Sequence, residues 1–190
     1  MQCAIDLARH QGFEHSCIPE VGRLLGVLAS HARGGVVGEI GTGTGVGAAW
    51  MVSHIDATTR FVTIEADAER AAAARGIFTD QPNVQIVHGD WRMIVEHGPF
   101  DLLFVDAGDA KASPDEPVEK AAAAAETILR ALRLGGMMVM DDLGPEDYWP
   151  EELRGRPDPL REFWLNDTRL KATEVLTTSR TVAIMATRVE

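Results

Sequence analysis

The chain has only two cysteines, Cys3 and Cys17, among its 190 residues. They form neither a metal-ligand motif nor a disulfide framework, so we expect buried or incidental thiols in a reducing compartment. The N-terminus lacks a basic segment followed by an apolar run, which is the pattern of a secretory signal. No apolar stretch approaches the roughly 18 residues that a membrane-spanning helix needs. These absences predict a cytoplasmic protein.

Positive charge is also scarce, since 18 Lys and Arg stand against 29 Asp and Glu, for a formal net charge of -11. Phosphate backbones and anionic lipid surfaces repel such a polyanion, which argues against nucleic acid or a membrane as the main partner. Hydrophobic residues make up 45% and charged residues 25%, as in ordinary globular proteins. Length and composition together predict one domain over residues 1–190 whose partner is a small molecule.

Strand-like and helix-like segments alternate along the chain. Short apolar or β-branched runs predict strands at 36–40, 60–65, 84–88, 100–105, 137–141, 171–177 and 181–188. Helical patterns lie at 18–32, 46–56, 67–79, 91–97, 115–133 and 160–166, the fifth stopped by Gly135-Gly136. Only residues 178–180 connect the last two predicted strands, so these strands should pair as an antiparallel hairpin. The fold class predicted is α/β, with a mostly parallel seven-stranded sheet, helices on both faces and this C-terminal hairpin.

A glycine-rich stretch, EIGTGTGVG at residues 39–47, lies between a predicted strand and a predicted helix. Glycines in such a turn let a ligand approach the main chain. Glu39 would repel a pyrophosphate but can pair with an ammonium group, and the alternating glycines give no clean G-x-G-x-x-G. We therefore predict that S-adenosylmethionine binds here, at Glu39, Gly41, Thr42, Gly43, Thr44 and Gly45.

Acidic residues end the following predicted strands. Glu65, with Ala66 beside it, stands where an acidic residue typically accepts hydrogen bonds from both ribose hydroxyls. Asp90, between Gly89 and Trp91, is predicted to accept from the adenine amino group while Trp91 shields the ring, and it can cap the next helix as well. Asp106 ends the fourth strand and is also predicted at the cofactor, because ligands of open α/β sheets bind at these strand ends.

Other interpretations of the same residues stay open. The turn can join strand to helix without a ligand, and Glu65 can serve only the start of its helix. A Rossmann oxidoreductase that uses NAD is a second enzymatic hypothesis. A protein that binds S-adenosylmethionine without catalysis is a third. The exposed hairpin edge and the N-terminal helix leave room for a homodimer, on which the sequence does not decide.

From about residue 15 to its end, the chain resembles class I S-adenosylmethionine-dependent methyltransferases, and within them the catechol and caffeoyl-CoA O-methyltransferase group. That group has an E-x-G-x-x-[TS]-G turn, then F-[IV]-D-A, then a strand ending in D-[ND]. The counterparts here are Glu39 to Gly45, Phe104 to Ala107, and Asp141-Asp142. The resemblance implies a Rossmann-like methyltransferase fold and methyl transfer to the oxygen of a small hydroxylated acceptor, aromatic in that group.

The resemblance also implies a metal site. In that group, three acidic or amide side chains hold a divalent cation, and the counterparts are Asp106, Asp141 and Asp142. Oxygen ligands suit Mg²⁺ or a similar hard cation, which would lower the pKa of the acceptor hydroxyl and orient it. Asp106 is thus a catalytic candidate too. The alternative is that Asp141 only ends its strand and Asp142 is a solvated carboxylate.

The chain departs from the group's pattern at the general base. The group usually has a Lys three residues after the Asp of its F-[IV]-D-A motif. The residue at that position here is Asp109, and Lys111 comes two residues later. Lys111 is a candidate base if its pKa is lowered, or else a solvated loop charge. His15 is another candidate base. Aromatic residues in and after the predicted loop 142–159 are expected either to line an acceptor pocket or to anchor packing: Tyr148, Trp149 and Trp164.

Overall fold

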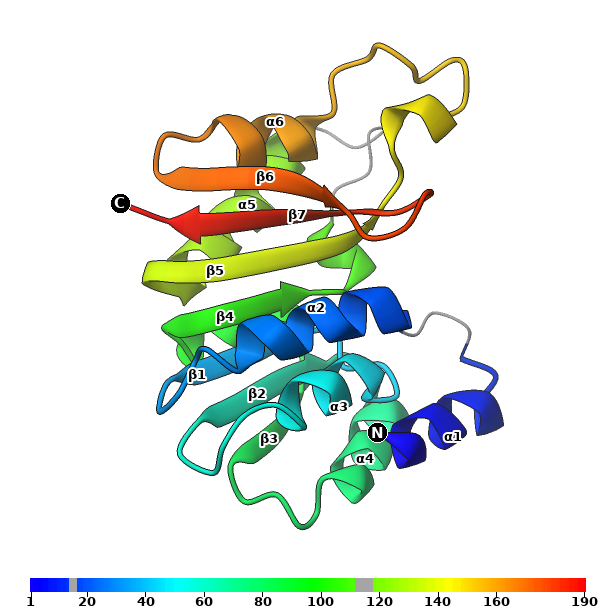
Figure 1. Ribbon diagram of the computed structural model, residues 1–190, viewed down its shortest axis with the longest axis vertical. Helices are drawn as coiled ribbons and strands as arrows, with labels where there is room; N and C mark the ends of the chain where they lie inside the picture. Colours follow the sequence, from blue (N-terminus) through cyan, green and yellow to red (C-terminus); the bar gives the residue numbers. More distant parts are fainter. Residues whose placement is uncertain (14–16, 112–117) are drawn as a thin grey trace.

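The computed structural model describes residues 1–13, 17–111 and 118–190, and within them seven strands form one sheet (Figure 1). In chain order they are β1 (Val36–Ile40), β2 (Arg60–Glu65), β3 (Val84–His88), β4 (Phe100–Val105), β5 (Leu132–Leu143), β6 (Leu170–Leu176) and β7 (Val182–Arg188). Their order across the sheet is β3-β2-β1-β4-β5-β7-β6. Only β7 runs antiparallel to its neighbours, β5 and β6, so the predicted fold class and terminal hairpin are confirmed.

Helices cover both faces of the sheet. They are α1 (Gln2–His10), α2 (Pro19–Ala29), α3 (Val46–Val52), α4 (Ala68–Ile77), α5 (Val118–Ala131) and α6 (Pro159–Asn166), with short 3-10 helices η1 (Trp91–Glu96), η2 (Gly108–Ala110) and η3 (Glu146–Tyr148). The first four α-helices share one buried cluster, and α5, α6 and η1 share the other. Figure 1 shows α2 and α3 in front of the sheet and α5 behind it. Within the described ranges, no helix is both long and apolar enough to span a membrane.

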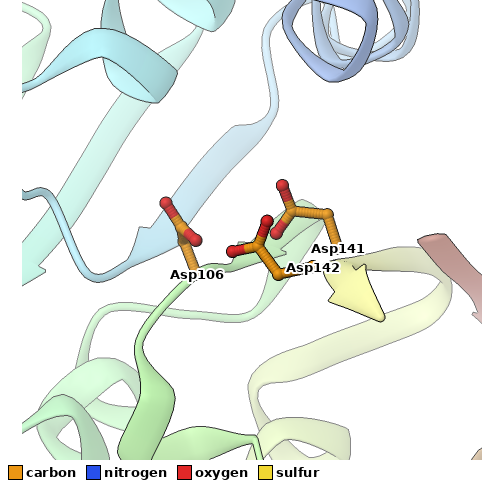
Figure 2. Close-up of side chains that lie close together, drawn as sticks. All are labelled: Asp106, Asp141 and Asp142. Atoms are coloured by element: carbon orange, nitrogen blue, oxygen red, sulfur yellow. The ribbon is translucent and has the colours of Figure 1, made fainter. Parts of the chain in front are cut away.

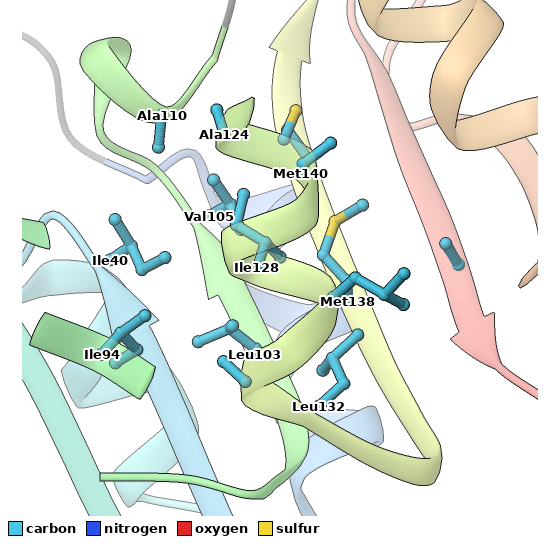
Figure 3. Packing of buried hydrophobic residues seen from close by; sticks show 14 of the residues in the cluster. Ile40, Ile94, Leu103, Val105, Ala110, Ala124, Ile128, Leu132, Met138 and Met140 are labelled. Carbon is cyan, nitrogen blue, oxygen red and sulfur yellow. The ribbon is translucent and has the colours of Figure 1, made fainter. Parts of the chain in front are cut away.

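The side chains of β4 alternate between these two clusters, as the pleat of a strand requires. Leu103 and Val105 pack toward α5, where they share a cluster with Ile128 (Figure 3). Leu102 and Phe104 face the cluster on the other side. Because all four are fully buried or nearly so, β4 is held from both faces, and the chain that follows it leaves the sheet from a fixed point.

The predicted boundary between the fifth helix and its strand is wrong. The helix α5 ends at Ala131, and β5 begins at Leu132, five residues before the predicted start at 137. Gly135 and Gly136 therefore lie within β5, where the register with β4 shifts. A Cβ at Gly136 would lie 2.4 Å from the carbonyl oxygen of Phe100. Gly136 allows a close approach of two strands and Gly135 adopts a positive φ, and a sequence pattern cannot distinguish either role from a helix stop.

The helix α1 was not predicted as an element. Its Ala4 and Ala8 are buried and one turn apart, and the helix lies against α3 and α4. Small residues at i and i+4 on a short segment form a weak signal, because alanine shows no strong hydrophobic contrast. The contact with α3 and α4, which is tertiary, stabilises this helix and sets the position of Phe13 just after it.

Of the two roles expected for Trp164, the acceptor pocket and the packing anchor, the structure supports the second, because Trp164 does not line the main cavity. Its side chain is 0% exposed, on the face of α6 that packs on α5 and β6. The ring meets that of Phe163 edge-on at 5.3 Å between centroids. Trp164 is therefore a packing anchor of the C-terminal half of the molecule.

We expect Trp164→Ala to lower the free energy of unfolding by about 3–5 kcal/mol, because the large cavity left behind cannot collapse fully. Urea denaturation measures this loss. The matched control is Trp149→Ala in the half-buried loop after β5, for which we expect a clearly smaller loss. Equal losses in the two variants would contradict the assignment of Trp164 to the core.

Candidate active site

The carboxyl ends of β1, β2, β3 and β4 open on a cavity of about 580 Å³. That edge of an open parallel sheet is where such folds bind ligands, and the volume suits a nucleoside-sized molecule. Most of the predicted site residues line the cavity: Gly41, Thr42, Gly43, Thr44, Glu65, Ala66, Gly89, Asp90, Trp91, Asp106, Lys111 and Asp142. Three others, Glu39, Gly45 and Asp141, are not among its lining residues.

The glycine-rich turn forms one wall of the cavity. Its first residues are tied to β2, since the Gly41 and Thr42 N–H groups donate to the Ile64 carbonyl at 2.9 and 3.2 Å. Gly41 has a φ of +92°, and a Cβ there would lie 2.8 Å from the backbone nitrogen of Ala107. Only glycine fits both the backbone conformation and the space. The turn is thus pressed against the chain that follows β4, which brings the two loops to one cavity.

Glu65 joins the end of β2 to this turn. Its Oε2 accepts from the Gly43 N–H at 2.8 Å, and its Oε1 accepts from the Asp67 N–H at 2.9 Å. Arg70 also donates to Oε1, from Nη2 at 3.0 Å and from Nε at 3.2 Å. A carboxylate oxygen has two lone pairs, so Oε1 is saturated while Oε2 has room for one more donor. The carboxylate both shapes the turn and keeps one acceptor position for a ligand.

Glu39 lies behind the turn instead of on the cavity wall. Its Oε2 accepts from the Thr63 hydroxyl at 2.7 Å, and Thr63 Oγ1 lies 2.6 Å from that of Thr42. Its Oε1 is buried against Gly47 of α3, where a Cβ would lie 2.3 Å away. Burial raises the pKa of Glu39 well above its usual range, although the hydrogen bond from Thr63 acts to lower that pKa. In this position Glu39 supports Thr42, and we do not assign it the predicted contact with a ligand ammonium.

Asp90 follows β3 and caps η1, as predicted. Its carboxylate accepts from the Arg92 N–H at 2.8 Å and pairs with the Arg92 guanidinium at 3.0 Å. The guanidinium also lies 4.7 Å from the centre of the Trp91 ring. Asp90 is more than half exposed and Trp91 is buried, so the two residues form a polar rim beside an apolar floor.

The three carboxylates of Asp106, Asp141 and Asp142 point into one space, the first from the end of β4 and the others from β5 (Figure 2). Consecutive residues of a regular strand point to opposite faces. Here β5 carries two residues, Asp141 and Asp142, opposite one residue of β7. Asp142 also has a φ of +62°, which Asp tolerates better than most residues. This bulge allows both carboxylates to reach the same point.

That point is occupied by the ammonium group of Lys111. Its Nζ lies 3.3 Å from Asp106 Oδ1, 3.0 Å from Asp141 Oδ1 and 3.2 Å from Asp142 Oδ2. Burial acts to lower the pKa of Lys111, but the charges of Asp141, Asp106 and Asp142 outweigh it and raise that pKa to about 12. A general base requires the opposite shift. We therefore do not assign the base to Lys111.

The carboxylates offer the donor chemistry of a hard cation, since their oxygens lie within 4.8 Å of one another. However, Mg²⁺ binds oxygen at about 2.0–2.1 Å and repels a second positive charge in the same space. With the ammonium in hydrogen-bond contact with all three side chains, the residues as they lie do not fit a divalent cation.

A sequence family described as "Methyltransferase domain" matches residues 39–143, more than half of the chain. The chain belongs to this family. The matched segment of the methyltransferase domain begins at Glu39 before the turn and ends just after the carboxylate pair of β5. It therefore spans the strand ends that form the cavity, and it favours the methyltransferase prediction over the oxidoreductase hypothesis.

Relatives and solved structures agree with this family. A protein of Mycobacterium ulcerans, provisionally named an O-methyltransferase, is 32% identical over 129 residues, which cover 64% of this chain but only 54% of the relative. An O-methyltransferase from Bacillus cereus, solved with S-adenosylhomocysteine, has a TM-score of 0.75 at 22% identity and covers 99% of this chain and 91% of that one. The O-methyltransferase TomG from Streptomyces achromogenes, solved with S-adenosylmethionine, has a TM-score of 0.77 at 20% identity, with coverage of 100% and 91%. These likenesses confirm the fold.

Phe13, Cys17 and Arg70 are among the residues that line the cavity without having been predicted there. Phe13 packs over Gly43, and the Arg70 guanidinium lies 5.7 Å from the centre of its ring. Burial raises the pKa of the Cys17 thiol, and the nearby carboxylates add to that shift. Phe13 meets Gly43 and Arg70 from a segment distant in sequence, so no local motif indicates its place at the cavity.

Two of the aromatic candidates, Tyr148 and Trp149, do not line the main cavity. Trp149 lines a separate, smaller cavity beside Arg161, and Tyr148 is 58% exposed. His15, the other candidate base, lies outside the described residues. The charged residues that line the main cavity from the chain after β4 and from β5 are therefore Asp106, Asp109, Lys111 and Asp142.

Proposed function

We propose that this chain binds S-adenosylmethionine in the cavity at the strand ends and transfers its methyl group to the oxygen of a small hydroxylated acceptor. Family membership and the names of the relatives support this proposal. The observation that carries it is the hydrogen bond from the Gly43 N–H to Glu65 Oε2. This bond joins the turn to β2 and leaves one lone pair of Oε2 to accept a hydrogen bond from a ligand. That cavity also reaches Asp106, so cofactor and acceptor sites are continuous.

The polarity of the cavity wall suggests how the cofactor lies. We assign Glu65 Oε2 as the acceptor for one ribose hydroxyl. The sequence alone suggested that Glu65 accepts from both ribose hydroxyls. Asp90 and Trp91 offer the polar rim and apolar floor that an adenine ring requires. The carboxylates of Asp106 and Asp142 provide negative charge for the positively charged sulfonium.

The reaction requires alignment more than covalent help from the protein. The acceptor oxygen attacks the methyl carbon, the carbon–sulfur bond breaks with its electron pair going to sulfur, and S-adenosylhomocysteine leaves. The acceptor hydroxyl loses its proton as the new bond forms, and Asp106 on the cavity wall is the group we propose to receive it.

Calorimetry with S-adenosylhomocysteine tests the cofactor half of this proposal. We expect stoichiometric binding together with a raised melting temperature, since a ligand that binds only the folded state stabilises it. NADH, followed by fluorescence quenching, is the control and should not bind. Absence of binding by both S-adenosylmethionine and S-adenosylhomocysteine would contradict the proposal. Binding without methyl transfer to any of a broad panel of hydroxylated acceptors would favour the non-catalytic hypothesis.

A further inference from the structure

The carboxylate cluster provides an acceptor for every N–H donor of the Lys111 ammonium. A lysine ammonium has three N–H donors, and Lys111 has one carboxylate acceptor for each. Lys111 is 13% exposed and Asp141 only 3%, so their contact is shielded from water. Such a contact is stronger than a surface ion pair and holds the lysine in place.

The chain around Lys111 directs it to the cluster. The short helix η2 is anchored by Ala110, which is 1% exposed and packs in the cluster of hydrophobic residues beneath β4. The Lys111 N–H donates to the Gly108 carbonyl at 3.0 Å, which closes the turn. Lys111 then leaves η2 in an extended conformation, toward Asp106 and β5. Its placement therefore follows from packing as well as from attraction between charges.

We propose that Lys111 is the resident cation of this site, so that the cluster of Asp106, Asp141 and Asp142 binds no divalent metal and the transfer reaction is metal-independent. This inference rests on the proposed function for its catalytic meaning. Lys111 acts as a positioning residue, since it holds Asp106 and Asp142 at the cavity wall. One ammonium among three carboxylates leaves net negative charge, which suits a cationic cofactor.

Titration with Mn²⁺ followed by electron paramagnetic resonance tests this proposal, with no cofactor or acceptor present. We expect no stoichiometric Mn²⁺ binding to the wild-type chain. Lys111→Met removes the ammonium and should bind one Mn²⁺, about a hundredfold or more tighter than the wild type, because a repelling charge is gone while three carboxylates remain. Adding Asp141→Asn to that variant should abolish the new site.

The matched control is Lys171→Met, which removes an exposed lysine of β6 and should leave Mn²⁺ binding as weak as in the wild type. Stoichiometric Mn²⁺ binding by the wild type that Asp141→Asn abolishes would overturn the proposal. That comparison is sufficient even where Lys111→Met does not fold.

Metal-dependent stabilisation provides a second measurement. Mg²⁺ and Mn²⁺ should raise the melting temperature of Lys111→Met but not that of the wild type. S-adenosylhomocysteine binding, measured separately by calorimetry, distinguishes the two proposals. Its absence would contradict the proposed function, whereas the Mn²⁺ titration alone decides which cation the carboxylates hold.

Discussion

Gly41→Ala is expected to weaken S-adenosylhomocysteine binding by at least about a hundredfold, as measured by calorimetry. The φ of +92° at Gly41 is unfavourable for alanine, and the new Cβ would lie 2.8 Å from the backbone nitrogen of Ala107. Since neither backbone can move without the strand end behind it, the turn must open and the cavity wall must shift. We also expect a stability loss of about 1–3 kcal/mol.

Gly76→Ala is the matched control, because it makes the same change within α4 at a position where nothing lies within 4 Å of the new Cβ. Its cofactor affinity should equal that of the wild type, and its stability should be equal or slightly higher, since alanine favours a helix over glycine. If Gly41→Ala bound the cofactor as tightly as Gly76→Ala, the turn would not be the binding wall.

Glu65→Ala should have an effect of similar size on cofactor binding. Glu65 is only 5% exposed. Its replacement removes the acceptor for the Gly43 N–H and leaves the Arg70 guanidinium without this partner. Hydrogen bonds to a charged group contribute about 1.5–3 kcal/mol each, so we expect at least about a hundredfold loss in S-adenosylhomocysteine affinity by calorimetry.

Glu69→Ala is the control for charge, since Glu69 lies exposed in the first turn of α4, close in sequence to Glu65. It should bind the cofactor normally. Glu65→Gln keeps one oxygen acceptor and should fall between the wild type and Glu65→Ala. Normal affinity in a folded Glu65→Ala would refute the role of this carboxylate, and thermal melting establishes that the variant is folded.

Local patterns were sufficient to predict most of the elements and one side of the site. The runs at β1, β2, β3 and β4 are apolar because these strands are buried in a parallel sheet, so their bounds were predicted correctly. The glycine turn, Glu65 and Asp90 follow such runs directly, and a residue that follows a parallel strand lies at the ligand-binding edge. Their position at the cavity could thus be predicted without knowledge of any long-range contact.

Side-chain direction could not be predicted in the same way. Glu39 precedes the turn in sequence, yet its carboxylate turns behind the cavity because the Thr63 hydroxyl of the neighbouring strand donates a hydrogen bond to it there. Phe13 reaches the cavity only because α1 packs against α3 and α4. In both cases the deciding contact joins segments far apart in the chain.

The sequence by itself determined the fold class, the edge of the sheet at which the cavity lies and the acidic character of the residues that follow β4 and end β5, because each depends on residue type and local order. Only the tertiary structure decided what the acidic residues hold. Asp141 and Asp142 converge because a bulge opposite β7 turns the second of them, and Lys111 meets them because the buried Ala110 fixes η2. A lysine thirty residues from Asp141 in sequence gives no local signal that its ammonium lies where the family resemblance implied a metal ion.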